Sequence, residues 1–241
     1  WNLVDKVVAS SRFREYVTDR AQELGQGNGP RGRDADAAGI TPEPLGGTYE
    51  NDGVTHRHVK VTLEGRVGTI TIQGPDSPPP ADAAAARANA NDLWFWRAAR
   101  ELDDILLDLR DNRQEVGTLV LKTEGDAAHI LAWDAFIAEH AETDWFIYEM
   151  LCAWKRVLKR VDLSARSLFA LIEPGSCFAG TLFDLTLACD RSYMLDDPDH
   201  PVSVQLSDLN RGPLPMSNGL TRLETRFLGS PDTLAAALAH E

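Results

Sequence analysis

The sequence predicts an α/β domain, and three observations support this. Short β-rich runs alternate with amphipathic helical runs over most of the chain, a pattern typical of strands joined by crossover helices. A stretch rich in glycine and proline, residues 25–56, separates a short N-terminal segment from the rest. An apolar run at 168–172 turns sharply into the small residues 179–181, which open an apolar helix at about 182–188.

The composition argues against some classes of protein. The chain has 241 residues, of which 43% are hydrophobic and 25% charged, an ordinary globular composition. The net charge of −13 argues against a general nucleic-acid surface, although a local Arg or Lys cluster would still suit a small anionic ligand. No apolar run reaches membrane-spanning length, and the first residues lack the pattern of a signal peptide. We therefore expect a cytoplasmic protein that binds neither nucleic acid nor membranes.

Motif searches give little support to metal or nucleophile chemistry. Cys152, Cys177 and Cys189 lack metal-ligand spacing and suit a reducing compartment. No HExxH, CxxC or Walker pattern occurs, so neither a metal nor a nucleoside triphosphate is indicated. Gly175-Ser176-Cys177 is not a nucleophile elbow, and no histidine completes a recognisable catalytic motif.

The N-terminal part is expected to be separate from the main domain. Residues 1–24 are predicted to form a short strand at 3–8 and then an amphipathic helix that begins near Ser10. Residues 25–56 show no periodicity and are predicted to be a linker. The main domain would then occupy residues 57–241.

The first half of the main domain begins with a hairpin. Residues 58–63 and 67–72 alternate apolar and polar side chains around Glu64-Gly65, as two antiparallel strands do. Residues 91–113 carry an apolar stripe at helical spacing. The remaining expected elements are a strand at 117–121, helices at 127–140 and 145–161, strands at 192–195 and 202–206, and helices at 218–228 and 231–240.

The strand–turn–helix at 168–188 is the strongest candidate for a site. Free N–H groups and the positive end of the helix dipole at residues 179–181 can hold an oxyanion or a phosphate. Asp184 lies one turn into the helix, and Asp208 follows the strand expected at 202–206. If the two carboxylates converge, they could perform general acid–base work on a thioester or carbonyl. An ordinary buried joint, with two ordinary acids, remains an equal alternative.

Residues 57–238 resemble the crotonase (enoyl-CoA hydratase/isomerase) superfamily. The resemblance is carried by the order of hairpin, long helix and buried strand, and by three motifs: Leu131-Ala-Trp-Asp134, Cys189-Asp190, and the segment 215–223. The run from Arg166 to Thr181, RSLFALIEPGSCFAGT, is specific to the benzoyl-CoA-dihydrodiol lyase family within it. Residues 1–24 resemble the strand and helix that close a preceding crotonase-like module.

This resemblance implies a crotonase-like spiral of ββα units that lacks its C-terminal helices. It implies oxyanion-hole N–H groups at Trp133 and at Thr181 or Gly180. The acid–base carboxylates would be Asp184 and Asp208, where the family has Glu; each side chain is shorter by roughly an ångström. A compensated pocket, a lost activity and a shifted alignment would each explain these two aspartates.

The implied activity is carbon–carbon lysis of an acyl-CoA thioester. The non-aromatic ring of an epoxidised or dihydroxylated benzoyl-CoA would open with loss of formate, in aerobic benzoate degradation. Coenzyme A would be part of the substrate and no cofactor would be needed. A homo-oligomer is expected. Two alternatives stay open: a generic enoyl-CoA hydratase or isomerase, and a non-catalytic crotonase-like module that binds acyl-CoA.

Overall fold

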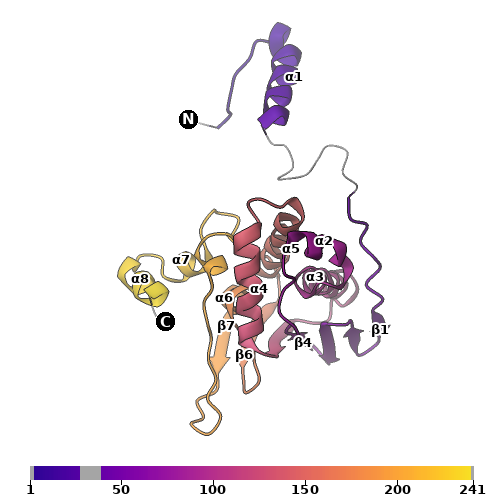
Figure 1. Ribbon diagram of the computed structural model, residues 1–241, viewed down its shortest axis with the longest axis vertical. Coiled ribbons are helices and arrows are strands. Elements are labelled where there is room, and N and C mark those ends of the chain that lie inside the picture. Colours follow the sequence, from indigo (N-terminus) through magenta and orange to yellow (C-terminus); the bar gives the residue numbers. More distant parts are fainter. Residues whose placement is uncertain (1–2, 28–38, 240–241) are drawn as a thin grey trace. The chain divides into compact units, whose positions relative to one another are not determined.

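The computed structural model describes residues 3–27 and 39–239 (Figure 1). It divides into two compact units, residues 1–38 and residues 39–241, which are described separately. No helix within the described ranges is both long and apolar enough to cross a bilayer.

The first unit contains one helix, α1 (Ser10–Gly27). The strand expected at residues 3–8 is not formed: residues 3–9 make no ladder. A strand is stable only when a neighbouring strand pairs with its N–H and C=O groups, and the described part of this unit offers none. The helix was predicted correctly, and its large apolar side chains are exposed, among them Phe13, Val17 and Leu24.

The second unit is built on a seven-stranded mixed sheet whose spatial order follows the chain. The three pairs among the first four strands are antiparallel, and the three pairs from the fourth strand onward are parallel. The predicted α/β class is confirmed. The strands are β1 (Thr48–Glu50), β2 (Gly53–Thr55), β3 (Val59–Glu64), β4 (Val67–Gln73), β5 (Thr118–Glu124), β6 (Ser167–Ile172) and β7 (Arg191–Met194).

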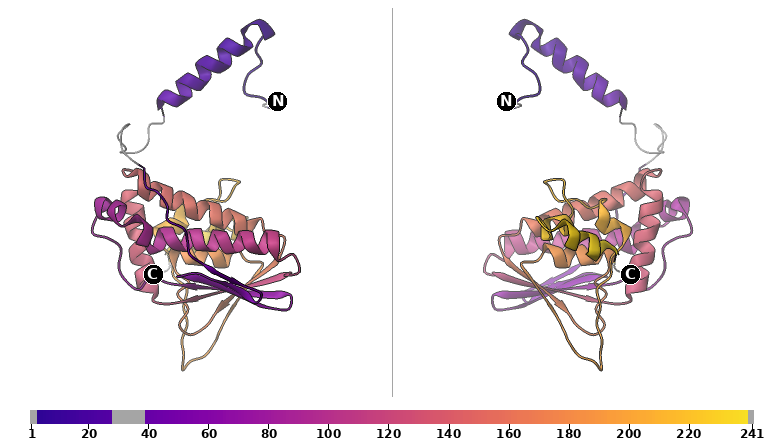
Figure 2. Two further views of the ribbon diagram at one scale, coloured as in Figure 1. Left: turned by 90° about the vertical axis from the view of Figure 1, so that its right-hand side faces the viewer. Right: turned by 90° about the vertical axis from the view of Figure 1, so that its left-hand side faces the viewer.

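The helices of this unit gather on one face of the sheet (Figure 2). The predicted helices at 127–140 and 145–161 are confirmed, and each is preceded by a capping aspartate, Asp126 or Asp144, whose side chain accepts backbone N–H bonds. The helices are α2 (Ala83–Ala88), α3 (Trp94–Asn112), α4 (Ala127–His140), α5 (Trp145–Asp162), α6 (Gly180–Ala188), α7 (Arg222–Arg226) and α8 (Pro231–Ala239), with 3₁₀ turns η1 (Ala90–Asp92) and η2 (Asp208–Arg211).

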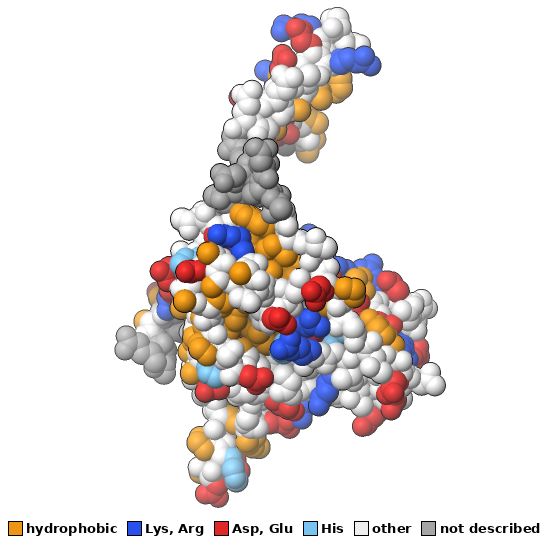
Figure 3. Space-filling view, turned by 45° about the vertical axis from the view of Figure 1, so that its right-hand side comes forward, with side chains coloured by type: hydrophobic (Ala, Val, Ile, Leu, Met, Phe, Trp, Pro, Cys, Tyr) orange, Lys and Arg blue, Asp and Glu red, His pale blue; other side chains and the backbone are white. Residues whose placement is uncertain are grey.

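The core lies between α3, α5 and the sheet. Trp154 of α5 and Phe95 of α3 are fully buried, and the Trp154 Nε1–H donates to the Phe95 carbonyl at 2.8 Å. On the face seen in Figure 3, Lys and Arg side chains alternate with Asp and Glu side chains, and they form no large basic patch there.

Three sequence predictions about element boundaries were wrong. The linker expected at 25–56 is too long, because β1 and β2 fall within it and the second unit begins at residue 39. Side chains of the long helix hold this segment: Arg97 donates to the Leu45 carbonyl and Arg100 to the Glu43 carbonyl, at 2.8 and 2.7 Å. Local periodicity does not reveal such long-range donors.

The second wrong prediction concerns the strand at 202–206. Only an isolated bridge between Ala179 and Gln205 forms there, with the Gly180 N–H donating to the Gln205 carbonyl at 2.9 Å. The helix expected at 218–228 is also shorter, because it starts after its capping residue Thr221.

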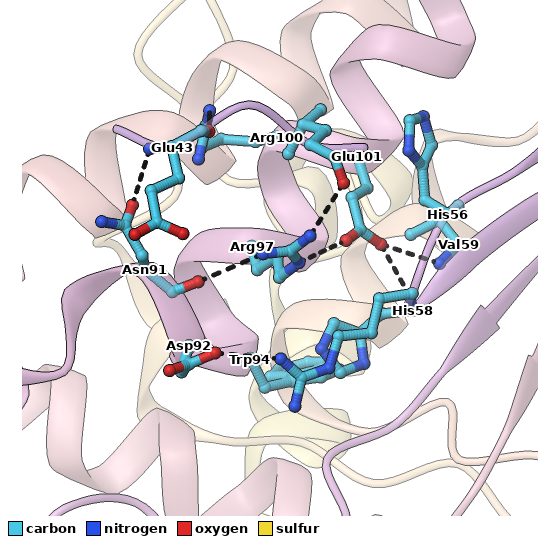
Figure 4. Close-up of polar contacts among 12 residues, drawn as sticks. Glu43, His56, His58, Val59, Asn91, Asp92, Trp94, Arg97, Arg100 and Glu101 are labelled. Carbon is cyan, nitrogen blue, oxygen red and sulfur yellow. Dashed lines mark hydrogen bonds and ion pairs between the residues drawn. The ribbon is translucent and has the colours of Figure 1, made fainter. Parts of the chain in front are cut away.

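A buried carboxylate, Glu101 of α3, ties the start of β3 to this helix (Figure 4). It accepts the His58 and Val59 N–H groups at 2.7 and 3.1 Å and pairs with Arg97 Nε at 2.8 Å. A buried charge is tolerated only when it is paired and hydrogen-bonded.

We therefore expect Glu101→Ala to lower the free energy of unfolding by about 3–5 kcal/mol, because it removes the charge partner of Arg97 and the acceptor of two backbone N–H groups. Urea titration followed by circular dichroism measures this. The control is Asp92→Ala, which breaks the exposed pair with Arg57 and should cost less than about 1 kcal/mol. Similar losses in the two variants would contradict the role given to Glu101.

Candidate functional site

The start of α6 has the geometry of an anion site. Gly180 has φ +46°, and a Cβ placed there would lie 1.8 Å from Asp134 Oδ2. Only glycine tolerates both the left-handed conformation and the close approach. Both backbone polar groups of Gly180 are hydrogen-bonded. Its N–H donates to the Gln205 carbonyl, and its carbonyl accepts the Asn210 side-chain amide at 2.9 Å.

The anion held there is the carboxylate of Asp134, from the middle of α4. The Thr181 N–H donates to Oδ2 at 2.8 Å and the Thr181 hydroxyl donates to Oδ1 at 2.7 Å. The Ser207 hydroxyl donates to Oδ2 at 2.6 Å. Asp134 is 1% exposed, so this contact excludes water. The anion at this helix start is therefore the chain's own side chain, and the oxyanion hole for a substrate stays a prediction.

Two buried acids share this region. Burial raises the pKa of Asp134 to about 6, against the lowering effect of the Ser207 and Thr181 hydrogen bonds. Burial raises the pKa of Asp184 to about 7; the Arg222 charge and the Asn210 amide lower it, and the Asp134 charge adds to the rise. Asp184 Oδ2 is buried and has no hydrogen-bond partner among residues 3–27 and 39–239.

The segment after β7 supplies the rest of the surroundings. Ser207 caps η2, with its N–H donating to Asn210 Oδ1 at 2.9 Å. Arg222 of α7 is buried and forms two bonds to Asp162, at 3.1 and 2.5 Å, with a third to the Leu214 carbonyl at 3.2 Å. Its guanidinium is therefore held in place by α5 and the loop before α7.

The structure places Gly180, Thr181 and Asp184 on α6, as expected, but the Gly180 N–H donates to the Gln205 carbonyl and is not the free donor that was predicted. The other two predicted residues do not join them. Trp133 is an interior residue of α4, where the backbone N–H belongs to the i→i−4 ladder, so the free N–H expected of it is not offered. Asp208 does not converge with Asp184: its side chain is 84% exposed and lies 3.5 Å from Arg211. η2 starts at this residue and turns Ser207 and Asn210 inward instead.

Sequence reasoning missed Asp134, Ser207, Asn210 and Arg222. A signal existed for Asp134 alone. It ends the motif Leu131-Ala-Trp-Asp134 and is a single acid within an apolar stretch of helix, where an acid needs a partner. The other three reach the site only through the loop path between β7 and α7, which has no periodic pattern.

A cavity of about 400 Å³ adjoins Trp133. Its walls combine polar and apolar side chains, with Asp76 and Asp92 among the polar ones. Three ring nitrogens hold one wall in place: Trp94 Nε1 donates to the Gln73 carbonyl and Trp133 Nε1 to the Ser77 carbonyl, while His129 Nδ1 lies 2.9 Å from the Pro75 carbonyl oxygen. The residues that line it include Arg57, His58, Leu93, Trp94, Trp133 and the run 75–80. Figure 4 shows His58 and Trp94 from this lining.

His58 is the unusual member of that lining. Its Nε2 is buried and has no hydrogen-bond partner within the described ranges. Burial lowers the pKa of His58, opposed mainly by the charge of Glu101. Among the same residues, no group of three or more His, Cys, Asp or Glu side chains is arranged to hold a metal ion.

Comparison with known proteins gives one close relative and several distant ones. A benzoyl-CoA-dihydrodiol lyase from Aromatoleum evansii is 42% identical over 243 residues, and the match covers 100% of this chain. The chain spans 43% of the length of that relative. No protein-family model matches.

The solved structures that match are distant in sequence. An enoyl-CoA hydratase from Geobacillus kaustophilus is 14% identical, with a TM-score of 0.49, over 76% of this chain and 61% of that one. An enoyl-CoA hydratase/carnitine racemase from Magnetospirillum magneticum is 16% identical, with a TM-score of 0.48, over 76% of this chain and 60% of that one.

The close approach at Gly180 predicts an unusually costly alanine substitution. Gly180→Ala should lower the free energy of unfolding by about 3–5 kcal/mol, because it strains the backbone and displaces the Asp134 carboxylate from its donors. Gly175→Ala is the matched control: its φ is also positive, +86°, but no atom lies within 4 Å of the new Cβ. It should cost only about 1 kcal/mol. Equal costs in urea titrations would show that Asp134 does not pack against Gly180.

The raised pKa of Asp184 predicts a pH-dependent stability. Between about pH 4 and pH 7 the folded state binds more protons at Asp184 than the unfolded state does. The free energy of unfolding therefore falls as pH rises through this range, and the destabilisation by Asp184 is constant above about pH 7. Asp184→Asn should therefore stabilise the chain at pH 8, by on the order of 2–4 kcal/mol relative to wild type, and much less at pH 4.5. Urea titrations at the two pH values measure this. A pH-independent difference between the two proteins would contradict the shift.

Proposed function

The chain resembles benzoyl-CoA-dihydrodiol lyase along its whole length, and on that premise we propose that it is one crotonase-type region of a carbon–carbon lyase that acts on a CoA thioester. The 42% identity over 100% of the chain is the observation that carries this proposal. The proposed substrate is a benzoyl-CoA whose ring has lost its aromaticity by epoxidation or dihydroxylation. Ring opening would release formate and leave an aliphatic semialdehyde-CoA, in aerobic benzoate degradation.

Residues 1–24 would belong to the module that precedes this one. The exposed apolar side chains of α1 support this, because an amphipathic helix gains its stability by burying such a face. A homo-oligomer remains part of the proposal.

Within this chain, the groups that suit thioester chemistry are the Thr181 N–H and the Asp184 carboxyl. An N–H at a helix start stabilises the negative charge that develops on a thioester oxygen when the adjacent carbon gains electron density. A carboxyl group with a pKa near 7 can both hold and release a proton at neutral pH. Asp184 would therefore be the proton carrier.

The cavity beside Trp133 is the proposed place for the acyl-CoA. Trp94, Trp133 and the proline run offer apolar surface. Arg57, whose side chain is 53% exposed, would exchange its pair with Asp92 for a phosphate of the ligand. Trp133 adjoins Asp134 in the sequence, so this cavity lies next to the helix that reaches Thr181.

One observation favours the alternative of a non-catalytic module. In the structure the Thr181 N–H is already bonded to Asp134, the Trp133 N–H lies in a helix interior, and Asp208 faces solvent. A thioester can use Thr181 only after Asp134 moves away. In the second candidate function, this region supports assembly or acyl-CoA binding while another region of the longer protein performs the chemistry.

Formate release from epoxybenzoyl-CoA tests the proposal, with this chain and the longest natural protein that contains it. We expect formate from the long protein, and a kcat about 10²–10⁴-fold lower in its Asp184→Asn variant if Asp184 carries the proton. Glu142→Gln, which changes an exposed acid, is the control and should leave the rate unchanged.

Three other outcomes are informative. Formate from the long protein with no effect of Asp184→Asn would favour the non-catalytic module. Hydration of crotonyl-CoA without formate would favour a hydratase. No formate from either protein would contradict the lyase proposal.

A further inference from the structure

Asp134 differs from the other aspartates at helix starts in this chain. Asp126 and Asp144 each cap the helix that they begin, accepting N–H bonds from residues two or three positions later. Asp134 lies inside α4 and caps α6, which is 47 residues away in sequence. Its own helix gains nothing from a carboxylate at that position, because an interior N–H group already has a partner.

The donors around Asp134 match a free carboxylate. Two donors reach Oδ2 and one reaches Oδ1, all between 2.6 and 2.8 Å, and they come from the two separate segments that carry Thr181 and Ser207. These distances are typical of charge-assisted bonds. Gly180 completes the cradle, since a Cβ there would overlap the carboxylate.

The cradle also adjoins an unsatisfied group. Asp184 Oδ2, one turn along α6, is buried with no hydrogen-bond partner in the described part of the chain. Asp184 is close enough to Asp134 for the two charges to affect each other. A buried polar atom without a partner marks a place where a further donor or a water belongs.

We propose that Asp134 is an autoinhibitory internal ligand: its carboxylate fills a carboxylate-binding cradle at the start of α6, and its removal opens that cradle to a small external monocarboxylate. The inference rests on the proposed function only in identifying this cradle with the thioester site. Carboxylate binding itself follows from the donors and can be measured without any substrate.

Thermal unfolding of Asp134→Ala in the full 241-residue chain, with sodium formate or sodium acetate, tests this. Either salt should raise the midpoint temperature of Asp134→Ala by about 3–6 °C at ten times its dissociation constant, relative to equal sodium chloride. Acetamide, which is neutral and of the same shape as acetate, should have no effect. Wild type should not respond, and neither should Asp134→Asn, whose amide still fills the cradle.

Asp144→Ala is the matched control, because it also removes a buried carboxylate from a helix start. The proposal predicts a formate or acetate response for Asp134→Ala that is absent in Asp144→Ala. Equal responses, or no response in Asp134→Ala, would overturn it. If Asp134→Ala does not fold in chloride, circular dichroism after dilution from urea into formate gives the same decision: recovery in formate supports the proposal, and failure to recover overturns it.

The outcome is separable from that of the lyase assay. If Asp134→Ala binds acetate but the protein forms no formate, the inference about Asp134 holds and the proposed lyase function is wrong. If the protein forms formate but Asp134→Ala does not respond to carboxylates, the proposed function holds and the inference about Asp134 is wrong.

Discussion

The arrangement around α6 depends on one contact, the carboxylate of Asp134 against the first turn of that helix. The contact joins three parts of the chain that are far apart in sequence: the middle of α4, the start of α6 and the segment that carries Ser207. It lies in a site from which water is excluded, where an unpaired charge would be costly and a fully bonded one is stable. The absence of a Cβ at Gly180 and the short distances to Thr181 and Ser207 are consequences of fitting a carboxylate there.

Because the cradle is filled, the site differs from an open oxyanion hole. The proposed thioester site consists of the start of α6 and Asp184, an acid one turn later with a pKa near neutrality. The carboxylate of Asp134 already occupies the N–H group of Thr181 at that helix start. The same geometry is therefore compatible with a region that must rearrange before it acts, and with a region that supports a catalytic partner. The longer benzoyl-CoA-dihydrodiol lyase relative, of which this chain spans 43%, leaves room for both.

Much of the fold could be predicted from periodicity. The stripe along α3, the capping aspartates of α4 and α5, and the alternation in β3 and β4 are local signals, and each of these elements was found. The strands β1 and β2 were missed because each has only three residues and forms by pairing with a neighbour, β1 with β2 and β2 with β3. A search for periodicity along the chain cannot detect such pairing. For the site, residues 180, 181 and 184 were located because strand, turn and helix are contiguous. Asp208 was misplaced because a 3₁₀ turn, and not a strand, decides which of residues 207–210 point inward.

The most direct test of the account is the amide proton of Thr181, followed by ¹⁵N–¹H NMR from pH 4 to pH 8. A hydrogen bond to a buried carboxylate shifts an amide proton downfield and slows its exchange with solvent. The account predicts that this proton exchanges slowly at pH 8, titrates with a midpoint near 6, the pKa of Asp134, and loses that titration in Asp134→Asn. A Thr181 amide that exchanges rapidly, or whose shift is the same in Asp134→Asn across this range, would contradict it.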